Sequence, residues 1–165
     1  MKVVNLQQGT KEWHEFRANH FGASEAPAMM GESKYQSRDD LLQAKKFGAE
    51  DPDAATQALF DKGHETEEKA RAIAEEIIGE ELYPVTGHSE FSKLSASFDG
   101  LTLDESISFE HKLYNEELAQ QIRDGSLAMH YVWQLEQQIM VSGAEKVLFM
   151  CSDGTTEKLD RDWET

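Results

Sequence analysis

Three charged residues within one short stretch of the chain could form a metal site with a lysine beside it. In "SASFDGLTLDESISFEHK", residues 95–112, Asp99 follows a short apolar run, and Glu110 comes eleven residues later with Lys112 after it. Two carboxylates together with a backbone carbonyl, here that of His111, make an oxygen site that suits Mg²⁺. A lysine beside the metal can orient or deprotonate a water molecule, or stabilise charge that develops on a phosphate.

Strand geometry would bring these groups together. In "SISFEHK", residues 106–112, side chains of a strand alternate, so Glu110 and Lys112 share one face. A turn at "LDES" would fold this strand onto "LSASFDG" and bring Asp99 within reach of Glu110. An E-x-K on a strand is also a common solvated face, and D-G a common turn. The spacing alone therefore leaves a metal site and a surface hairpin both open.

A third carboxylate lies on a long helical segment, residues 54–78. Glu67 shares a helix stripe with Ala70 and Ala74, which are suited to a buried face, whereas Glu68 falls with Arg71 on the solvent face. A carboxylate on a buried face needs a cation or hydrogen bonds. Arg71, four residues further on, is one candidate partner for Glu67 and a metal ion is another, and the two are not exclusive.

The order of the expected elements is mixed. Helical patterns, with Thr10, Ser24 and Ser37 as N-caps, occupy residues 11–20, 23–31, 38–47, 54–78, 115–125 and 130–143. Strand patterns occupy residues 82–86, 89–91, 94–100, 106–112 and 145–151. We therefore expect one α/β domain over residues 1–165, with a mixed central β-sheet flanked by helices. The last segment, residues 152–165, begins an amphipathic element that ends before it can bury anything, so we expect the domain to be truncated there.

Composition restricts the possible partners. The chain has 165 residues and a formal net charge of −16, which argues against nucleic acid because phosphates bind Lys and Arg. Net charge is not local charge, so a DNA-binding chain of this kind must gather basic residues on one face. The candidates are Lys34, Arg38, Lys45, Lys46, Lys62, Arg123 and Lys146.

The same composition bears on the compartment. A single cysteine, Cys151, rules out an internal disulfide framework and fits a reducing cytoplasm. No stretch approaches the roughly 18 apolar residues of a membrane span. The start, "MKVVNLQQGT", is not expected to act as a secretory signal.

A series of motifs, each weak alone, is specific in this order and with these gaps. The series consists of Arg17 with "GASE" (22–25), "GHETEEKAR" (63–71), "SFDG" (97–100), "EHK" (110–112) and "YVWQLEQQ" (131–138). On these residues the chain resembles the phage-type alkaline exonucleases, the lambda-exonuclease/YqaJ group of PD-(D/E)xK nucleases. Phe98 stands where the family usually has proline, and "LY" at 113–114 where it usually has cysteine-proline. Neither departure removes a charged group.

The resemblance implies a restriction-endonuclease-like core and a processive, Mg²⁺-dependent exonuclease, in which Mn²⁺ can substitute. Such an enzyme digests one strand of double-stranded DNA from the 5′ end, releases 5′-mononucleotides and leaves a 3′ single-stranded tail for homologous recombination by strand annealing. Carried over by motif, the metal ligands are Asp99, Glu110 and the His111 carbonyl, with Glu67 at a second metal, and Lys112 acts on the attacking water. The residues that receive the 5′-phosphate are Arg17, Ser24, Ser97 and Gln134.

The resemblance also implies a ring-shaped homotrimer, a single-strand annealing protein as partner, and a phage or prophage gene expressed in a bacterial cytoplasm. Two other functions remain open: an inactive DNA-end or recombination adaptor, favoured by the acidic charge, and a sequence-specific endonuclease, disfavoured because no extra length is present for reading bases. Individual roles have simpler alternatives too. Arg17 could pair with an acid of its own helix, Ser24 could be only a cap, and Gln134 could be a surface residue.

Overall fold

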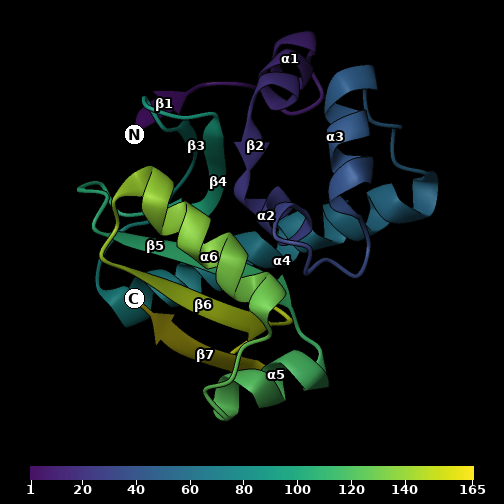
Figure 1. The fold of residues 1–165 in the computed structure, drawn as a ribbon. Coiled ribbons are helices and arrows are strands. Elements are labelled where there is room, and N and C mark those ends of the chain that lie inside the picture. The colour runs from purple at the N-terminus through teal and green to yellow at the C-terminus, as the bar shows by residue number, and fades with distance from the viewer. The chain divides into compact units, whose positions relative to one another are not determined.

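The computed structural model describes all of residues 1–165 and divides them into two compact units, each built from three segments of the chain. The first unit contains Met1–Glu50, Val85–Ser97 and Ala128–Gly143; the second contains Asp51–Pro84, Phe98–Leu127 and Ala144–Thr165. In chain order, the elements are β1 (Lys2–Val4), α1 (Lys11–Asn19), β2 (Phe21–Gly22), the 3₁₀ helix η1 (Ala23–Glu25), α2 (Ala26–Met29), α3 (Arg38–Phe47), α4 (Ala54–Ile78), β3 (Tyr83–His88), β4 (Leu94–Leu101), β5 (Ile107–Leu113), α5 (Glu116–Arg123), α6 (Met129–Ser142), β6 (Lys146–Ser152) and β7 (Leu159–Glu164) (Figure 1).

The strands are hydrogen-bonded in the order β1-β3-β4-β5-β6-β7, with β2 beside β4. Strands β2 and β4 are parallel, as are β5 and β6, whereas β1–β3, β4–β5 and β6–β7 are antiparallel. The expected mixed sheet flanked by helices is therefore confirmed. None of the helices is long and apolar enough to cross a lipid bilayer.

Local sequence signals set most helix ends. The hydroxyls of Thr10 and Ser37 accept hydrogen bonds from the third backbone N–H of α1 and α3, as caps do. Helix α4 runs for 25 residues and ends at Gly79, whose φ of 82° lies in the left-handed region. These boundaries are those that the sequence predicts.

Two local expectations are wrong. Ser24 is not an N-cap: it lies inside η1, and the cap position belongs to Gly22, whose N–H is bound by the Glu25 carboxylate at 2.9 Å. Residues 89–91 form no strand; they belong to the turn that joins β3 to β4. At η1 the competing contact is local, because the Glu25 carboxylate lies three residues after Gly22. At residues 89–91 a short alternating run does not reveal whether a partner strand lies beside it.

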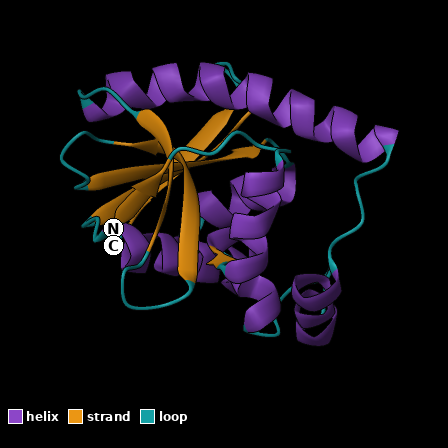
Figure 2. Ribbon diagram, turned by 90° about the horizontal axis from the view of Figure 1, so that it is seen from above, coloured by secondary structure: helices purple, strands orange, loops and turns teal.

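The core of the second unit lies between α4 and the strands β5 and β6 (Figure 2). Its fully buried members include Ala70 and Ala74 from α4, Phe109 from β5, and Leu148 and Met150 from β6. The small side chains of α4 allow the helix to approach the strands closely. Because Phe109 faces this core, its neighbour Glu110 points to the opposite face of β5, as strand alternation predicts.

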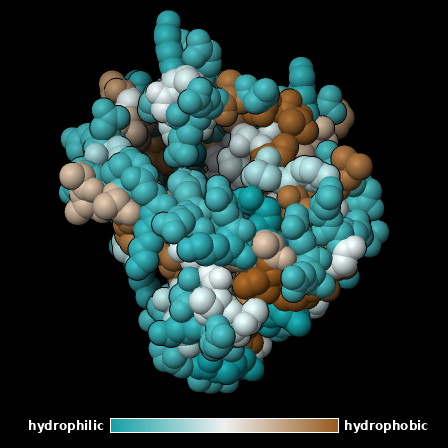
Figure 3. All heavy atoms as spheres, turned by 180° about the vertical axis from the view of Figure 1, so that it is seen from behind, coloured by the Kyte–Doolittle hydropathy of each residue, from teal (hydrophilic) through white to brown (hydrophobic).

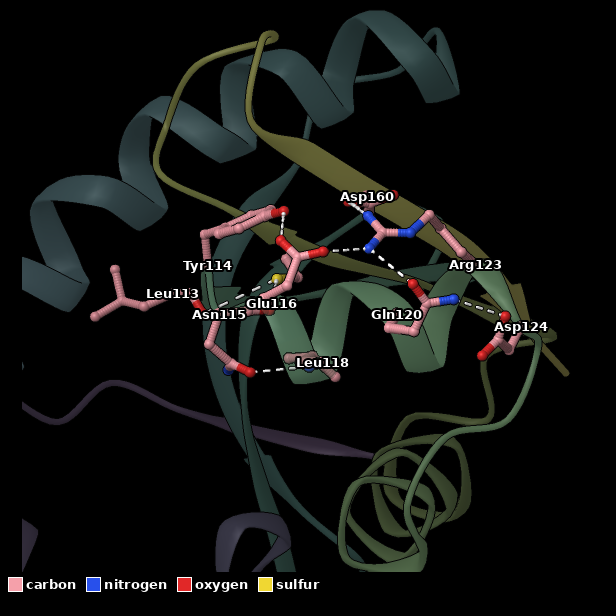
Figure 4. Close-up of polar contacts among 10 residues, drawn as sticks. Leu113, Tyr114, Asn115, Glu116, Leu118, Gln120, Arg123, Asp124 and Asp160 are labelled. Atoms are coloured by element: carbon pink, nitrogen blue, oxygen red, sulfur yellow. Dashed lines mark hydrogen bonds and ion pairs between the residues drawn. The ribbon is translucent and has the colours of Figure 1, made fainter.

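The C-terminal segment is part of this unit. Strand β7 pairs along its whole length with β6, and Leu159 and Trp163 pack against the core. Helix α5 lies beside β7 and is joined to it by Arg123, which donates to Asp160 at 2.9 Å and to Glu116 at 2.6 Å (Figure 4). The expectation that this segment ends before burying anything is therefore wrong, because a strand on an existing sheet needs only one partner to bury its inner face.

Gly100 in β4 provides a stability test. A Cβ at this position would lie 2.9 Å from the Cβ of the buried Leu82, so Gly100→Ala should destabilise the protein by about 1–3 kcal/mol through overpacking. Gly63, inside α4, has nothing within 4 Å of an added Cβ, so Gly63→Ala should stabilise by about 0.5–1 kcal/mol. Urea unfolding of both variants checks the pair; equal effects would contradict the packing seen at Gly100.

Candidate active site

A group of three carboxylates is assembled within the second unit. Gly100 of β4 pairs with Phe109 of β5, and Asp99 and Glu110 come immediately before and after this pair in their strands. The turn at residues 102–106 folds the strands together as expected, since Asp104 accepts from the backbone N–H and the hydroxyl of Ser106. Glu67 joins them from α4. Arg71, which binds the Glu67 carboxylate and donates to the Asp99 carbonyl, joins α4 to β4 beside these residues.

That effect is clearest at Asp99. Burial, then the negative charges of Glu110 and Glu67, raise the pKa of Asp99 well above its ordinary value. The backbone N–H of His111, which donates to Asp99 Oδ2 at 2.7 Å, and the charge of Lys112 act in the opposite direction. Without a further cation, the folded protein therefore holds Asp99 in a place where its negative charge is unfavourable.

Lys112 and Glu110 form the predicted pair on one face of β5. The Lys112 ammonium lies 2.6 Å from Glu110 Oε1, with the glutamate side chain 4% and the lysine side chain 29% exposed. Their positions at i and i+2 of a strand put both side chains on the same face. The carboxylate is thus nearly enclosed, while the ammonium reaches the surface beside it.

The His111 side chain points to the face opposite Glu110. Its ring lies near Phe109, and its Nε2 is 2.9 Å from the Ser152 hydroxyl. Burial lowers the pKa of His111 to about 4, so the imidazole is neutral near pH 7. Only the backbone of this residue lies with the carboxylates, which agrees with the expectation that its carbonyl, and not its ring, serves the site.

Arg71 corrects one prediction. It does not lie on a solvent face: its side chain is 16% exposed, its Nη2 binds Glu67 Oε1 at 2.7 Å, and its Nε donates to the Asp99 carbonyl at 2.6 Å. Arg71 therefore ties α4 to β4 at the carboxylate group. The i, i+4 spacing from Glu67 is visible in the sequence, but the bond to Asp99 spans 28 residues and is not.

The carboxylate group suits a divalent metal chemically. No three His, Cys, Asp or Glu side chains are positioned to hold one ion as they stand. Glu67 and Glu110 are instead paired with Arg71 and Lys112. The donors are nevertheless hard oxygens, and a cation among them would offset the repulsion that raises the pKa of Asp99. The residues that would hold it are Asp99, Glu110 and the His111 carbonyl, with Glu67 close by.

The four residues expected at a 5′-phosphate all belong to the first unit. Arg17 is in the last turn of α1 and is paired not with an acid of its own helix but with Glu25 of η1, at 2.9 Å. Its side chain remains 39% exposed. The alternative that Arg17 serves only its own helix is therefore wrong.

The other three residues, Ser24, Ser97 and Gln134, lie on η1, β4 and α6. Strand β2 pairs with β4, and η1 contacts α6. A Cβ on Gly22 would be 3.9 Å from the hydroxyls of both Ser24 and Ser95, so these two hydroxyls flank one point of the backbone. Ser97 is exposed and its hydroxyl is 2.9 Å from that of Thr86, whereas Gln134 is half-buried on α6.

Sequence reasoning missed a further group in the same unit. Gln137 of α6 is buried and donates to the carbonyls of Phe21 at 2.7 Å and Ser95 at 2.9 Å, which fastens α6 to β2 and β4. A polar residue on the apolar side of α6, three after Gln134, is the one signal that could have identified it. The sequence placed Lys45 among the candidate DNA-binding cations and Glu25 in a family motif, but it did not indicate that the two form an ion pair.

The YqaJ-like viral recombinase domain matches residues 12–145, which is most of the chain and includes every site residue named above. This chain belongs to the YqaJ-like viral recombinase family. No curated protein sequence matches it significantly.

Solved structures agree with the assignment of this YqaJ-like chain. It is similar to an alkaline exonuclease, LHK-Exo from Laribacter hongkongensis, with 25% identity and a TM-score of 0.71 over 93% of this chain and 81% of that one. The structure of LHK-Exo in complex with dAMP superposes with a TM-score of 0.73 at 24% identity, over 94% of this chain and 82% of that one. The YqaJ-like fold is thus shared along nearly the whole chain.

Proposed function

We propose that this YqaJ-like protein is a metal-dependent 5′-to-3′ exonuclease that digests double-stranded DNA during recombination. The observation that carries the proposal is the group formed by Asp99, Glu110 and Glu67, with Lys112 at 2.6 Å from Glu110. An adaptor protein has no physical need to hold a carboxylate where burial and two like charges oppose its ionisation. Similarity to an alkaline exonuclease at 25% identity supports the same reaction class.

Asp99, Glu110 and Lys112 have different roles in this proposal. Asp99 is held by the His111 N–H on one side and, through its carbonyl, by Arg71 on the other, so its carboxylate is fixed before any ligand arrives. Glu110 accepts a hydrogen bond from the Lys112 ammonium, which can donate a proton or a hydrogen bond to groups around the reacting phosphate. Only after it loses a proton could the Lys112 amine take one from the attacking water. A bound Mg²⁺ would supply positive charge to the phosphate and lower the pKa of a water molecule.

Digestion of a duplex with one 5′-phosphorylated end, with and without Mg²⁺, tests the proposal. We expect 5′-mononucleotides to appear from the phosphorylated strand only when the metal is present, and a 3′ single-stranded tail to remain. DNA-end binding without hydrolysis in Mg²⁺ or Mn²⁺ would instead establish the adaptor. Cleavage inside a circular duplex at one sequence would establish the endonuclease.

Arg17→Ala should impair the use of 5′-phosphorylated ends more than that of 5′-hydroxyl ends. A guanidinium can bind a phosphate through two parallel charge-assisted hydrogen bonds, and loss of such contacts lowers kcat/KM about tenfold or more. The measurement is kcat/KM on two duplexes that differ only in the 5′ group. Equal losses on both would exclude 5′-phosphate recognition by Arg17.

The charge of the chain is divided very unequally. The first unit has eight basic and nine acidic residues, a net charge of −1, whereas the second has eight basic and 23 acidic residues, a net charge of −15. In the second unit, Arg123 is bound by Glu116 and Asp160, and Lys146 lies over the ring of Trp163. We infer that the basic residues of the first unit carry most of the attraction to the DNA backbone.

Binding of duplex DNA should therefore weaken with salt, but only shallowly. The expected slope of log K against log salt is roughly −0.9 for each phosphate neutralised, and few phosphates can be neutralised by so small a set of basic residues. Fluorescence anisotropy of a labelled duplex between low and moderate salt, with EDTA present, measures the slope. A slope indistinguishable from zero would contradict electrostatic binding to the backbone.

A ring of three subunits and an annealing protein as partner remain part of the proposal. Several large apolar side chains are strongly exposed, including Phe47, Phe91 and Leu103, and a subunit or partner interface would cover such groups. On the face drawn in Figure 3, hydrophobic residues lie in separate patches among hydrophilic ones. Light scattering of the purified protein tests the trimer directly.

A further inference from the structure

A largely enclosed glutamate in the first unit, Glu25, is shared by two cations. Glu25 Oε1 lies 2.9 Å from Arg17 Nη2 and 2.8 Å from Lys45 Nζ, and Glu25 Oε2 accepts from the Gly22 N–H at 2.9 Å. The side chains of Glu25 and Lys45 are each only 12% exposed, whereas that of Arg17 is 39% exposed. The group thus has one enclosed cation, one enclosed anion and one cation that reaches the surface.

Lys45 also holds the backbone of the helix that carries Arg17. Its ammonium donates to the Arg17 carbonyl at 2.6 Å and lies 5.7 Å from the centre of the Phe21 ring. The Arg17 guanidinium is itself placed over the Trp13 ring, at 5.1 Å. Lys45, on α3, therefore fixes both the counter-ion and the main chain of Arg17.

The charges explain why two cations are needed. A buried carboxylate that loses its cation is strongly unfavourable. If Arg17 were the sole cation beside Glu25, turning it toward a phosphate would leave that carboxylate uncompensated. With Lys45 and the Gly22 N–H still bound to Glu25, the Arg17 guanidinium can exchange its one bond to Glu25 for bonds to an incoming anion.

We propose that Lys45 is a positioning residue that, by neutralising Glu25, keeps Arg17 available for the 5′-terminal phosphate of DNA. This inference rests on the proposed role of Arg17. It adds a residue from a different helix, and it predicts that the effect of losing Lys45 depends on Glu25. A cluster that only joined α1, η1 and α3 would not affect discrimination between two kinds of DNA end.

The test is the 5′-phosphate preference, defined as kcat/KM on a 5′-phosphorylated duplex divided by kcat/KM on the same duplex with a 5′-hydroxyl. Lys45→Met should lower this preference about tenfold, because Arg17 is then retained by Glu25. Lys45→Arg, which keeps a cation beside Glu25, should preserve most of it. The double variant Lys45→Met with Glu25→Gln should regain much of the loss, because the charge that retains Arg17 is gone.

Three controls accompany these variants. Lys11→Met removes a lysine that is also paired with a glutamate in this unit, but in an exposed pair with Glu15 at 3.6 Å, and should leave the preference unchanged. Anisotropy with both duplexes in EDTA repeats the comparison without turnover. Thermal unfolding identifies any variant that fails to fold. If Lys45→Met does not fold, the 5′-phosphate preferences of Lys45→Arg and of the double variant test the role of Lys45.

The outcomes separate the two proposals. A wild-type preference that Arg17→Ala does not alter would overturn the role of Arg17, and this inference with it. A preference that Arg17→Ala abolishes but Lys45→Met leaves intact would overturn this inference alone. A loss in Lys45→Met that Glu25→Gln deepens would show that the cluster is merely structural, and would also overturn it.

Discussion

Replacing Asp99 or Glu110 by alanine should reduce DNA hydrolysis by at least about 10³-fold, because each removes a carboxylate needed to hold the metal whose charge stabilises the transition state. Binding of a DNA end in EDTA should change little. Asp99→Asn, which keeps a hydrogen-bond acceptor for the His111 N–H, should be equally inactive and yet raise the melting temperature in metal-free buffer. The reason is that burial and the charges of Glu110 and Glu67 make the Asp99 carboxylate unfavourable in the folded state.

Added Mg²⁺ provides a second readout. It should raise the melting temperature of the wild-type protein, since a ligand that binds only the folded state stabilises it, and should not raise that of Asp99→Ala. Glu117→Ala, which removes an exposed carboxylate from α5 in the same unit, serves as the control and should behave as wild type. Near-normal turnover of Asp99→Ala or Glu110→Ala at saturating Mg²⁺ would refute the assignment of the metal ligands.

Lys112→Ala should bind DNA and metal almost normally while kcat falls by about two to four orders of magnitude. A group that acts on protons or charge in the transition state contributes to kcat and not to ground-state affinity. The expected signature is a lower kcat with little change in KM at steady state, together with a slower chemical step in single-turnover experiments. Lys112→Arg keeps the positive charge but cannot readily give up a proton. It should therefore show whether Lys112 acts through its charge or through proton transfer.

The matched control is Lys69→Ala. Lys69 is also paired with a glutamate in the second unit, Glu65, but this pair is exposed, at 3.2 Å, and lies on the solvent face of α4. The control should lose neither kcat nor affinity, since exposed ion pairs contribute little. If Lys112→Ala only weakened DNA binding, Lys112 would be a phosphate contact and not a participant in the reaction.

The sequence was most informative where one residue and its near neighbours decide the outcome. Thr10, Ser37 and Gly79 set helix ends through contacts within a few residues, and all three act as predicted. Strand alternation placed Glu110 and Lys112 together because their separation depends only on the pleat of one strand. Both rules operate over a few residues, so their outcome can be predicted from the sequence without knowledge of the fold.

Ion pairs between distant parts of the chain were decided by packing. The helical pattern predicts that Arg71 faces solvent. In the structure α4 lies close to β4, and the Arg71 guanidinium donates to the Asp99 carbonyl. Lys45 and Glu25 are 20 residues apart and on different helices, so nothing in their spacing indicates a shared charge cluster. A buried pair forms wherever tertiary packing removes water from both groups, and that event has no fixed sequence separation.

The division of charge follows the same principle. A net charge of −16 alone argues against nucleic acid, and the sequence cannot say where that charge lies. The fold collects residues from three segments into each unit and leaves one nearly neutral and the other at −15. The sequence by itself thus determined the family motifs, several helix ends and the alternation of side chains along β5. Only the tertiary structure decided which cations meet which carboxylates, because those contacts depend on segments that are distant in the chain and adjacent in space.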